Sequence, residues 1–120
     1  MGEVRISYKL CNPQNPELCA EIKDALVDTG SSYNLVPRSI LEKIGVKPIP
    51  KKVDIELGTG QVIKSEIALA VCEVNGRVGP CPVIPTEEQV EPLFGVLNME
   101  AMGMRVDPST GQISFKPLRL

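Results

Sequence analysis

Residues 25–32 consist of a short apolar run followed at once by Asp28, Thr29, Gly30 and two serines. The apolar run is typical of the end of a buried strand, and Gly30 allows the backbone to turn sharply just beyond it. A carboxylate in that position needs hydrogen-bond donors, because burying an unpaired charge is unfavourable. Thr29, Ser31 and the Gly30 amide are the nearest donors. The stretch therefore predicts either an acid–base group held in a loop or an ordinary Asp turn.

A second motif follows much later in the chain, where Leu93 and Phe94 precede Gly95 and a short amphipathic segment ends at Gly103. An apolar strand that leads into Asp-Thr-Gly, with two apolar residues and a glycine before a later helix, resembles the retroviral-like (retropepsin-like) aspartic proteases. The resemblance is strongest to their small bacterial and archaeal relatives, and it extends from about Val4 to Phe115. In that family the second motif passes behind the first and supports the catalytic loop.

The resemblance implies roles for individual residues. Asp28 corresponds to the catalytic aspartate, and Thr29 to the residue whose hydroxyl contacts the loop of a partner subunit. Gly30 corresponds to the position whose backbone lines the substrate, and Ser31 belongs to the same supporting loop. The segment Gly58-Thr59-Gly60 corresponds to the tip of the flap, a hairpin that folds over bound peptide and excludes water. From the residues alone, this segment also fits an ordinary hairpin turn.

Aspartic-protease chemistry requires two carboxylates that share one proton, one to activate water and the other to polarise the peptide carbonyl. The 120 residues contain a single Asp-Thr-Gly sequence and are too few for a two-lobed enzyme with an internal repeat. The second carboxylate must therefore come from another chain. A symmetric homodimer with one Asp28 per subunit at its two-fold axis provides it, as the resemblance implies. The expected substrate is a peptide or a protein.

Two other functions fit the same residues. A catalytically silent module of the same fold would bind peptides or mediate dimerisation, because the motif can be intact while the flap or the dimer is unproductive. The other alternative is a small all-β structural domain in which Asp28 makes an ordinary turn. Peptide cleavage at mildly acid pH that a statine-type transition-state mimic inhibits separates the enzyme from both.

Composition argues against several other classes of function. Thirteen basic and fifteen acidic residues give a net charge of −2 without a basic cluster, so nucleic-acid and anionic-membrane binding have no support. No apolar run approaches the roughly 18 residues that span a bilayer, and the first residues do not resemble a signal peptide. We therefore expect a cytoplasmic protein. The chain contains no histidine, which excludes Ser-His-Asp and Cys-His catalysis, and we expect no metal or other cofactor.

The four cysteines are Cys11, Cys19, Cys72 and Cys81. None belongs to a Cys-x-x-Cys pair, so zinc binding and thioredoxin-type chemistry are poorly supported. We expect all four to be free thiols in the cell. Cys11 and Cys19 flank one loop and could meet across a hairpin, so the spacing leaves open whether any disulfide forms.

Alternating apolar and polar residues predict a mainly β fold, closed and barrel-like, that forms a single domain over residues 1–120. We expect roughly eight short strands with one or two short helices. The predicted strands are residues 4–10, 18–27, 33–36, 53–57, 61–74, 77–84, 93–95, 104–106 and 112–115, and residues 11–17 are predicted to be a loop.

Particular residues mark the turns and helix ends. Asn75-Gly76 predicts a tight hairpin. Pro37 is expected to begin the first helix, and Asn98 is expected to cap a helical turn over Met99–Met102. The two prolines within strand 77–84 should confine that strand to an edge or a bulge.

Overall fold

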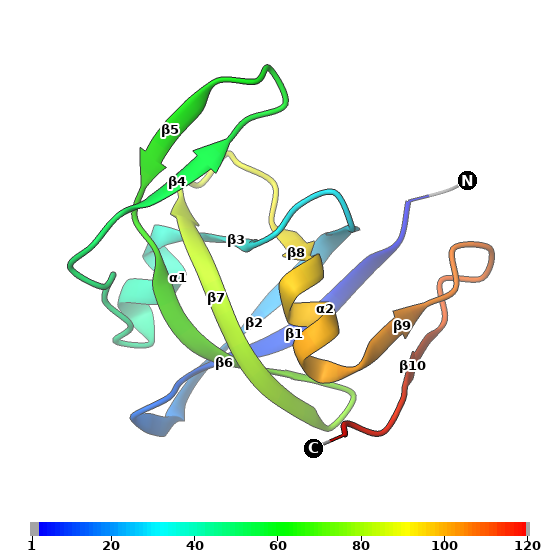
Figure 1. Ribbon diagram of the computed structural model, residues 1–120. Coiled ribbons are helices and arrows are strands. Elements are labelled where there is room, and N and C mark those ends of the chain that lie inside the picture. The colour runs from blue at the N-terminus through cyan, green and yellow to red at the C-terminus, as the bar shows by residue number, and fades with distance from the viewer. Residues whose placement is uncertain (1–2, 120) are drawn as a thin grey trace.

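The computed structural model describes residues 3–119 and contains ten strands and two short helices (Figure 1). Six of the strands form a closed ring in the order β1-β2-β8-β3-β7-β6. The mainly β, barrel-like prediction is confirmed. The strands are β1 (Arg5–Asn12), β2 (Asn15–Asp28), β3 (Asn34–Pro37), β4 (Val53–Glu56), β5 (Val62–Ser65), β6 (Ala68–Val74), β7 (Arg77–Thr86), β8 (Leu93–Gly95), β9 (Met104–Val106) and β10 (Ile113–Phe115), and the helices are α1 (Arg38–Lys43) and α2 (Val96–Met102).

The ring encloses an apolar core, and β1 illustrates how the sequence builds it. Ile6, Tyr8 and Leu10 are buried, whereas the residues between them are exposed. The ring of Tyr8 packs edge-on against that of Phe94 in β8, with the ring centroids 5.1 Å apart. A fully buried side chain of this size contributes about 1.5–3 kcal/mol to stability. These contacts therefore hold β8 firmly inside the sheet.

The position of β8 between β2 and β3 determines the path of the segment that connects β2 to β3. On one side, β8 pairs in parallel with β2 and places Gly95 opposite Asp28. On the other side, Leu93 pairs with Leu35 of β3. The segment 29–33 connects β2 to β3, so it must pass over the end of β8.

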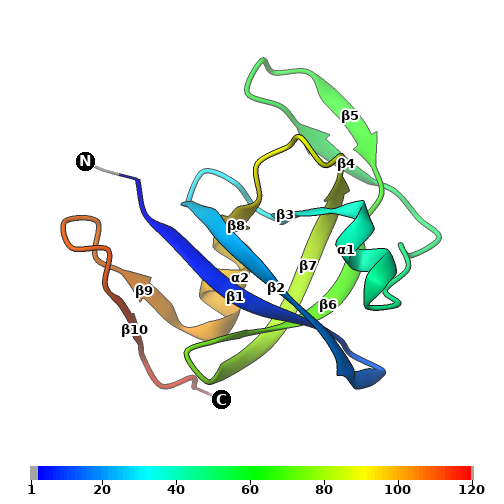
Figure 2. The ribbon, with the colours of Figure 1, turned by 180° about the vertical axis from the view of Figure 1, so that it is seen from behind.

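Two hairpins lie outside the ring. The β4–β5 hairpin extends away from the ring, beyond β3 and β8, in both Figure 1 and Figure 2. The β9–β10 hairpin lies on the side of the ring opposite α1, near the start of β1 (Figure 2). Each hairpin forms a separate two-stranded sheet that is not part of the closed ring.

Two predicted elements differ from the structure because the chain changes partners within them. Residues 61–74 form two strands instead of one, since the chain leaves the β4–β5 hairpin after Ser65 and enters the ring at Ala68. The Glu66 carboxylate pairs with Arg38 at 2.8 Å at this junction. The strand 77–84 extends to Thr86, and it pairs with β3 only from Val83 onward. Within the described residues, Pro80 and Pro82 lie where β7 has β6 as its one strand neighbour. The edge prediction holds for that part alone, because the strand as a whole lies between β3 and β6 in the closed ring.

The predicted helix starts also shift. Pro37 is the last residue of β3 and the N-cap of α1, one position before the helix. The second helix begins at Val96 instead of Met99, with Gly95 as its N-cap. The prediction that Asn98 caps this helix is wrong, because Asn98 lies inside the helix with its side chain buried in the core.

A disulfide joins Cys11 to Cys19, so the prediction of free thiols is wrong for this pair. The predicted loop over residues 11–17 is mostly strand, because β1 continues to Asn12 and β2 already begins at Asn15. The two cysteines are therefore directly opposed across the hairpin, with Cα atoms 4.1 Å apart. Cys72 and Cys81 are buried free cysteines, as predicted.

This disulfide predicts the outcome of a thiol titration. Denatured protein should show two reactive thiols without reductant and four after reduction. Reduction should lower the free energy of unfolding by about 2–3 kcal/mol, the chain-entropy value for a loop this short. Urea unfolding with and without reductant measures that loss. Four reactive thiols in the unreduced protein would contradict the pairing.

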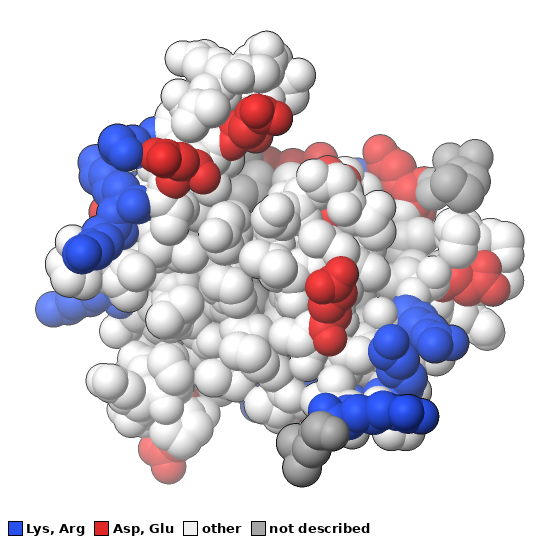
Figure 3. Space-filling model, viewed as in Figure 1, with Lys and Arg blue, Asp and Glu red and all other residues white. Residues whose placement is uncertain are grey.

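The face of the molecule in Figure 3 has no single dominant charge. On the face in Figure 3, basic and acidic side chains form small separate groups, and uncharged atoms cover most of the area. Among residues 3–119, no helix has both the length and the apolar character needed to cross a membrane.

Candidate active site

Asp28 is the last residue of β2 and is half-buried. Its Oδ1 accepts a hydrogen bond from the Gly30 amide at 2.9 Å, and its carbonyl oxygen accepts one from the Ser31 amide at 3.1 Å. These bonds close a tight turn around the carboxylate. A Cβ atom on Gly30 would lie 3.2 Å from Asp28 Oδ1, so a larger residue would crowd the acidic group.

The two hydroxyl residues beside Asp28 do not act as the donors that the sequence suggested. Ser31 Oγ donates to the carbonyl of Tyr33 at 3.0 Å, so it supports the backbone of the loop. Thr29 is exposed, and its hydroxyl makes no hydrogen bond within residues 3–119. Of the three expected donors, only the Gly30 amide reaches the carboxylate.

The segment 29–33 rests on the N-terminal end of α2. The amide of Val96 donates to the Ser31 carbonyl at 2.8 Å, and the amide of Leu97 donates to the Ser32 carbonyl at 3.1 Å. Gly95 has no side-chain cap of its own to offer the helix. The loop thus satisfies helix amides that would otherwise have no intrahelical partner. The resemblance implied that the segment around Gly95 supports the Asp28 loop, and these contacts confirm it.

Gly95 is required here because the two backbones approach so closely. A Cβ atom at this position would lie 2.6 Å from the carbonyl oxygen of Tyr33 and 2.8 Å from that of Ser32. Both contacts are with backbone atoms, which cannot rotate away as a flexible side chain can. The glycine of the second motif therefore serves packing against the loop.

A buried polar network lies behind the loop. Asn34 and Asn98 are the buried polar residues among the described ones, with exposed fractions of 0% and 1%. Asn34 contacts the Tyr8 hydroxyl and Cys81 Sγ, and Cys72 Sγ donates to Asn98 Oδ1 at 3.0 Å. Burial raises the pKa of Tyr8 well above its usual value. The Cys72 thiol and burial together raise the pKa of Cys81. The Tyr8 hydroxyl and the Cys81 thiol therefore both stay neutral at physiological pH.

A cleft of about 720 Å³ separates the loop from the β4–β5 hairpin. Gly30 and Ser31 line it from the loop side, and Gly58 lines it from the hairpin. Thr59 and Gly60 lie at the exposed tip of the hairpin, where Gly60 has a φ of +87°. The remaining lining residues are Ser32, Tyr33, Leu35, Asp54, Ile55, Glu56, Leu57, Ile63, Ser65, Ile84, Leu93 and Leu97.

The cleft lining is mainly apolar and contains no basic residue. Ile55 and Ile63 are register partners across the β4–β5 hairpin, so they present a paired aliphatic surface. The alternation of residues 53–57 marks Ile55 in the sequence, whereas Ile63 simply follows Val62, and nothing there shows that either residue faces the Asp28 loop. A smaller cavity of about 320 Å³ lies beside α1 and includes no residue of the segment 28–33.

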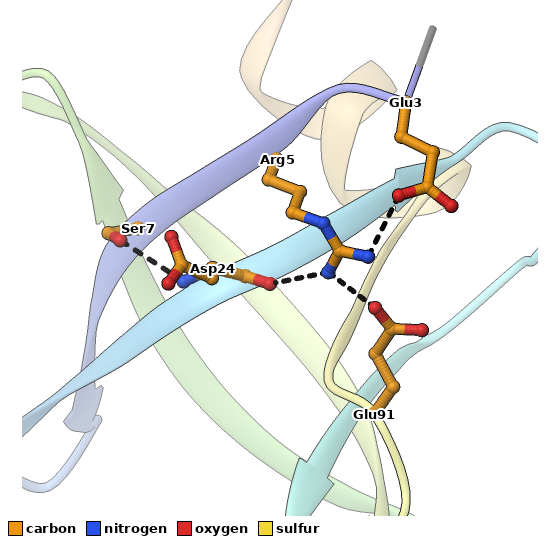
Figure 4. Close-up of polar contacts among 5 residues, drawn as sticks. All are labelled: Glu3, Arg5, Ser7, Asp24 and Glu91. Atoms are coloured by element: carbon orange, nitrogen blue, oxygen red, sulfur yellow. Dashed lines mark hydrogen bonds and ion pairs between the residues drawn. The ribbon is translucent and has the colours of Figure 1, made fainter.

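Arg5 connects β1 to the chain that leads into β8 (Figure 4). Its guanidinium pairs with Glu91, pairs with Glu3 at 2.9 Å and donates to the Asp24 carbonyl at 3.2 Å. Asp24 has a φ of +52° in an irregular stretch of β2, and its amide binds Ser7 Oγ at 3.2 Å. Because these groups are exposed, the ion pairs contribute little to stability. They join β1 to β2 and to the segment that precedes β8.

The comparisons with known proteins agree with this geometry. A family model described as "Aspartyl protease" matches residues 20–101, a range that includes both Asp28 and Gly95. A search of curated proteins found no significant match. Within residues 3–119, no group of three or more histidine, cysteine or acidic residues is arranged to hold a metal ion.

Proposed function

Because the chain belongs to the aspartyl protease family, we propose that it is an aspartic endopeptidase whose active site forms between two copies of the chain. The position of Asp28 is the main support. Its carboxylate lies at a strand end, is held by a backbone amide, and is two residues from Gly30, which lines the cleft. Each chain supplies one such carboxylate, and the reaction needs two.

In the proposed reaction, the two Asp28 carboxyl groups share one proton. The ionised carboxylate accepts a proton from a water molecule, whose oxygen attacks the carbonyl carbon of the peptide. The protonated carboxyl donates its hydrogen to the carbonyl oxygen, which gives a neutral tetrahedral intermediate. The carboxyl that took the proton from water then protonates the amide nitrogen, and the other carboxylate takes a proton from one hydroxyl of the intermediate. The C–N bond breaks, an amine and a carboxylic acid are released, and the pair again holds one proton.

The β4–β5 hairpin fits the role of a flap in this reaction. It lies across the cleft from the loop, and its Ile55 and Ile63 give the cleft an apolar wall. Closure of such a hairpin over an extended peptide would exclude water from the reacting groups and strengthen their electrostatic interactions. The tip Gly58-Thr59-Gly60 is exposed and can therefore contact a bound peptide.

The experiment that tests this proposal measures both cleavage and assembly. We expect cleavage of a peptide library at mildly acid pH, inhibited by a statine-type transition-state mimic. Below the dimer dissociation constant, about tenfold dilution should lower the cleavage rate per chain about tenfold, because the dimer fraction follows mass action. Thr29→Val should weaken the dimer by about 1–3 kcal/mol, since the exposed Thr29 hydroxyl is available to bond the partner's loop.

Thr59→Val is the matched control for dimer affinity, because it makes the same change at an exposed threonine of the hairpin tip. Sedimentation equilibrium should show an unchanged dissociation constant for this variant. A protein that sediments as a monomer while its cleavage per chain is undiminished would exclude the shared site. Peptide binding without cleavage would favour the catalytically silent module.

A further inference from the structure

The loop that contains Asp28 has three hydrogen bonds to the start of α2, and one of them depends on a side chain. Ser31 and Ser32 use their backbone carbonyls for the amides of Val96 and Leu97. The third bond joins the Gly95 amide to Oδ1 of Asn34, the first residue of β3, at 2.7 Å. Any residue can supply a backbone carbonyl, but only a side-chain acceptor of the right length can supply the third contact.

The environment of Asn34 fixes which way its amide points. The Gly95 N–H is a donor only, so Oδ1 must face it, and Nδ2 is directed to the other side. There Nδ2 lies 3.3 Å from the Tyr8 hydroxyl, 3.3 Å from Cys81 Sγ and 3.4 Å from Asn98 Oδ1. The bond to Gly95 is much shorter than these three. The side chain is fully buried, so water cannot replace any of its partners.

Asn34 and Asp28 are both placed against Gly95, from the two ends of the loop. Asp28 is the register partner of Gly95 in the parallel β2–β8 pair, and Asn34 accepts the Gly95 amide hydrogen. Residues 29–33, which lie between them, are therefore held at both ends against Gly95. A shift at the Asn34 end would be transmitted through this short segment to the carboxylate.

Asn34 also accepts a hydrogen bond that a residue of α2 itself would accept in a capping box. In a capping box, the N3 side chain reaches back to the amide of the N-cap residue. Here Gly95 is the N-cap, so N3 is Asn98, but the Asn98 side chain turns away and donates to the Pro80 carbonyl. The N-cap amide would remain buried and unpaired without Asn34.

We propose that Asn34 is a positioning residue that orients Asp28 by fixing the loop to Gly95. Its consequence for catalysis rests on the proposed function, whereas its hold on the loop does not. Asn34 supplies an acceptor and two donors from one short side chain, which an apolar residue of the same size cannot do. Asn34 thereby keeps the Asp28 carboxylate in the position and orientation that the reaction needs.

The test compares Asn34→Leu with Asn98→Leu. Each replaces a buried asparagine of the same network by an apolar residue of similar size, but only the first removes the partner of the Gly95 amide. Amide hydrogen exchange by NMR should show Gly95 exchanging about tenfold faster or more in Asn34→Leu, after correction for global stability. The Asn98→Leu variant should show no selective change at Gly95. In peptide cleavage, Asn34→Leu should lower kcat about tenfold while KM changes little.

A third variant keeps the test decisive if Asn34→Leu does not fold. Asn34→Asp retains the Oδ1 acceptor, and burial favours its protonated form, which also retains a donor. The Tyr8 hydroxyl and the Cys81 thiol contact this position, and both have pKa values well above their usual ones, so they are neutral at acid pH. The nearby Cys72 thiol, whose pKa its contact with Cys81 lowers, binds Asn98 instead. Asn34→Asp should therefore keep both Gly95 protection and kcat in the acid range. Loss of either would overturn the proposal.

The outcomes separate this inference from the proposed function. Equal Gly95 exchange in Asn34→Leu and Asn98→Leu would show a merely structural role and overturn the proposal, whatever the activity. Faster Gly95 exchange with an unchanged kcat would overturn the effect on catalysis. If the native protein cleaves no peptide, the proposed function fails, while the exchange of Gly95 still decides whether Asn34 holds the loop.

Discussion

Asp28→Asn should lower kcat for peptide cleavage by about 10³-fold or more, because the change removes the general base from both subunits of the dimer at once. The fold should remain intact. Asparagine has the same shape as aspartate, and its Oδ1 can still accept the Gly30 amide hydrogen that closes the turn. Steady-state kinetics measure the loss, and circular dichroism with thermal unfolding checks the fold.

Asp24→Asn is the matched control for this prediction. Asp24 lies in the same strand, is exposed, and has a positive φ that asparagine tolerates well. Its side chain is exposed and takes no part in the turn of residues 28–31 beside the cleft, so the kcat of this variant should stay close to that of the native protein. Activity of Asp28→Asn within tenfold of the native enzyme would rule out the aspartic mechanism.

Gly95→Ala should reduce the free energy of unfolding by about 1–3 kcal/mol, the usual range for forcing an extra group into a closely packed site. Its Cβ would lie 2.6 Å from the Tyr33 carbonyl oxygen, so the loop or β8 must move. Any such movement separates the loop from α2 and should also lower cleavage. Urea unfolding measures the stability loss directly.

Gly58→Ala separates this clash from the general effect of replacing glycine. No heavy atom lies within 4 Å of a Cβ built on Gly58, and its φ is not in the left-handed region. Its stability should therefore stay within about 0.5 kcal/mol of the native value, as for most surface substitutions. An equal loss of stability in Gly95→Ala and Gly58→Ala would mean that the close approach of the loop is not the reason for a glycine at position 95.

The sequence alone was sufficient for the local features of this protein. Alternation in β1 predicted which residues are buried, because successive side chains of a strand point to opposite faces. Asn75-Gly76 predicted the β6–β7 hairpin, since both residues adopt the positive φ that such a tight turn requires. Asp28 at a strand end, with a donor at Gly30, was likewise evident from neighbours in the chain.

Tertiary structure decided what depends on residues far apart in the chain. The order β2-β8-β3 places Gly95 beneath the Asp28 loop, and that order follows from which strands pair. The strand pairing also brought Cys11 opposite Cys19, where the sequence suggested a loop. Asn34 was not singled out in the sequence, because its burial and its bond to Gly95 arise only when the ring closes. Local patterns record which face of a strand is buried, but the choice of its neighbours is a property of the whole packed core.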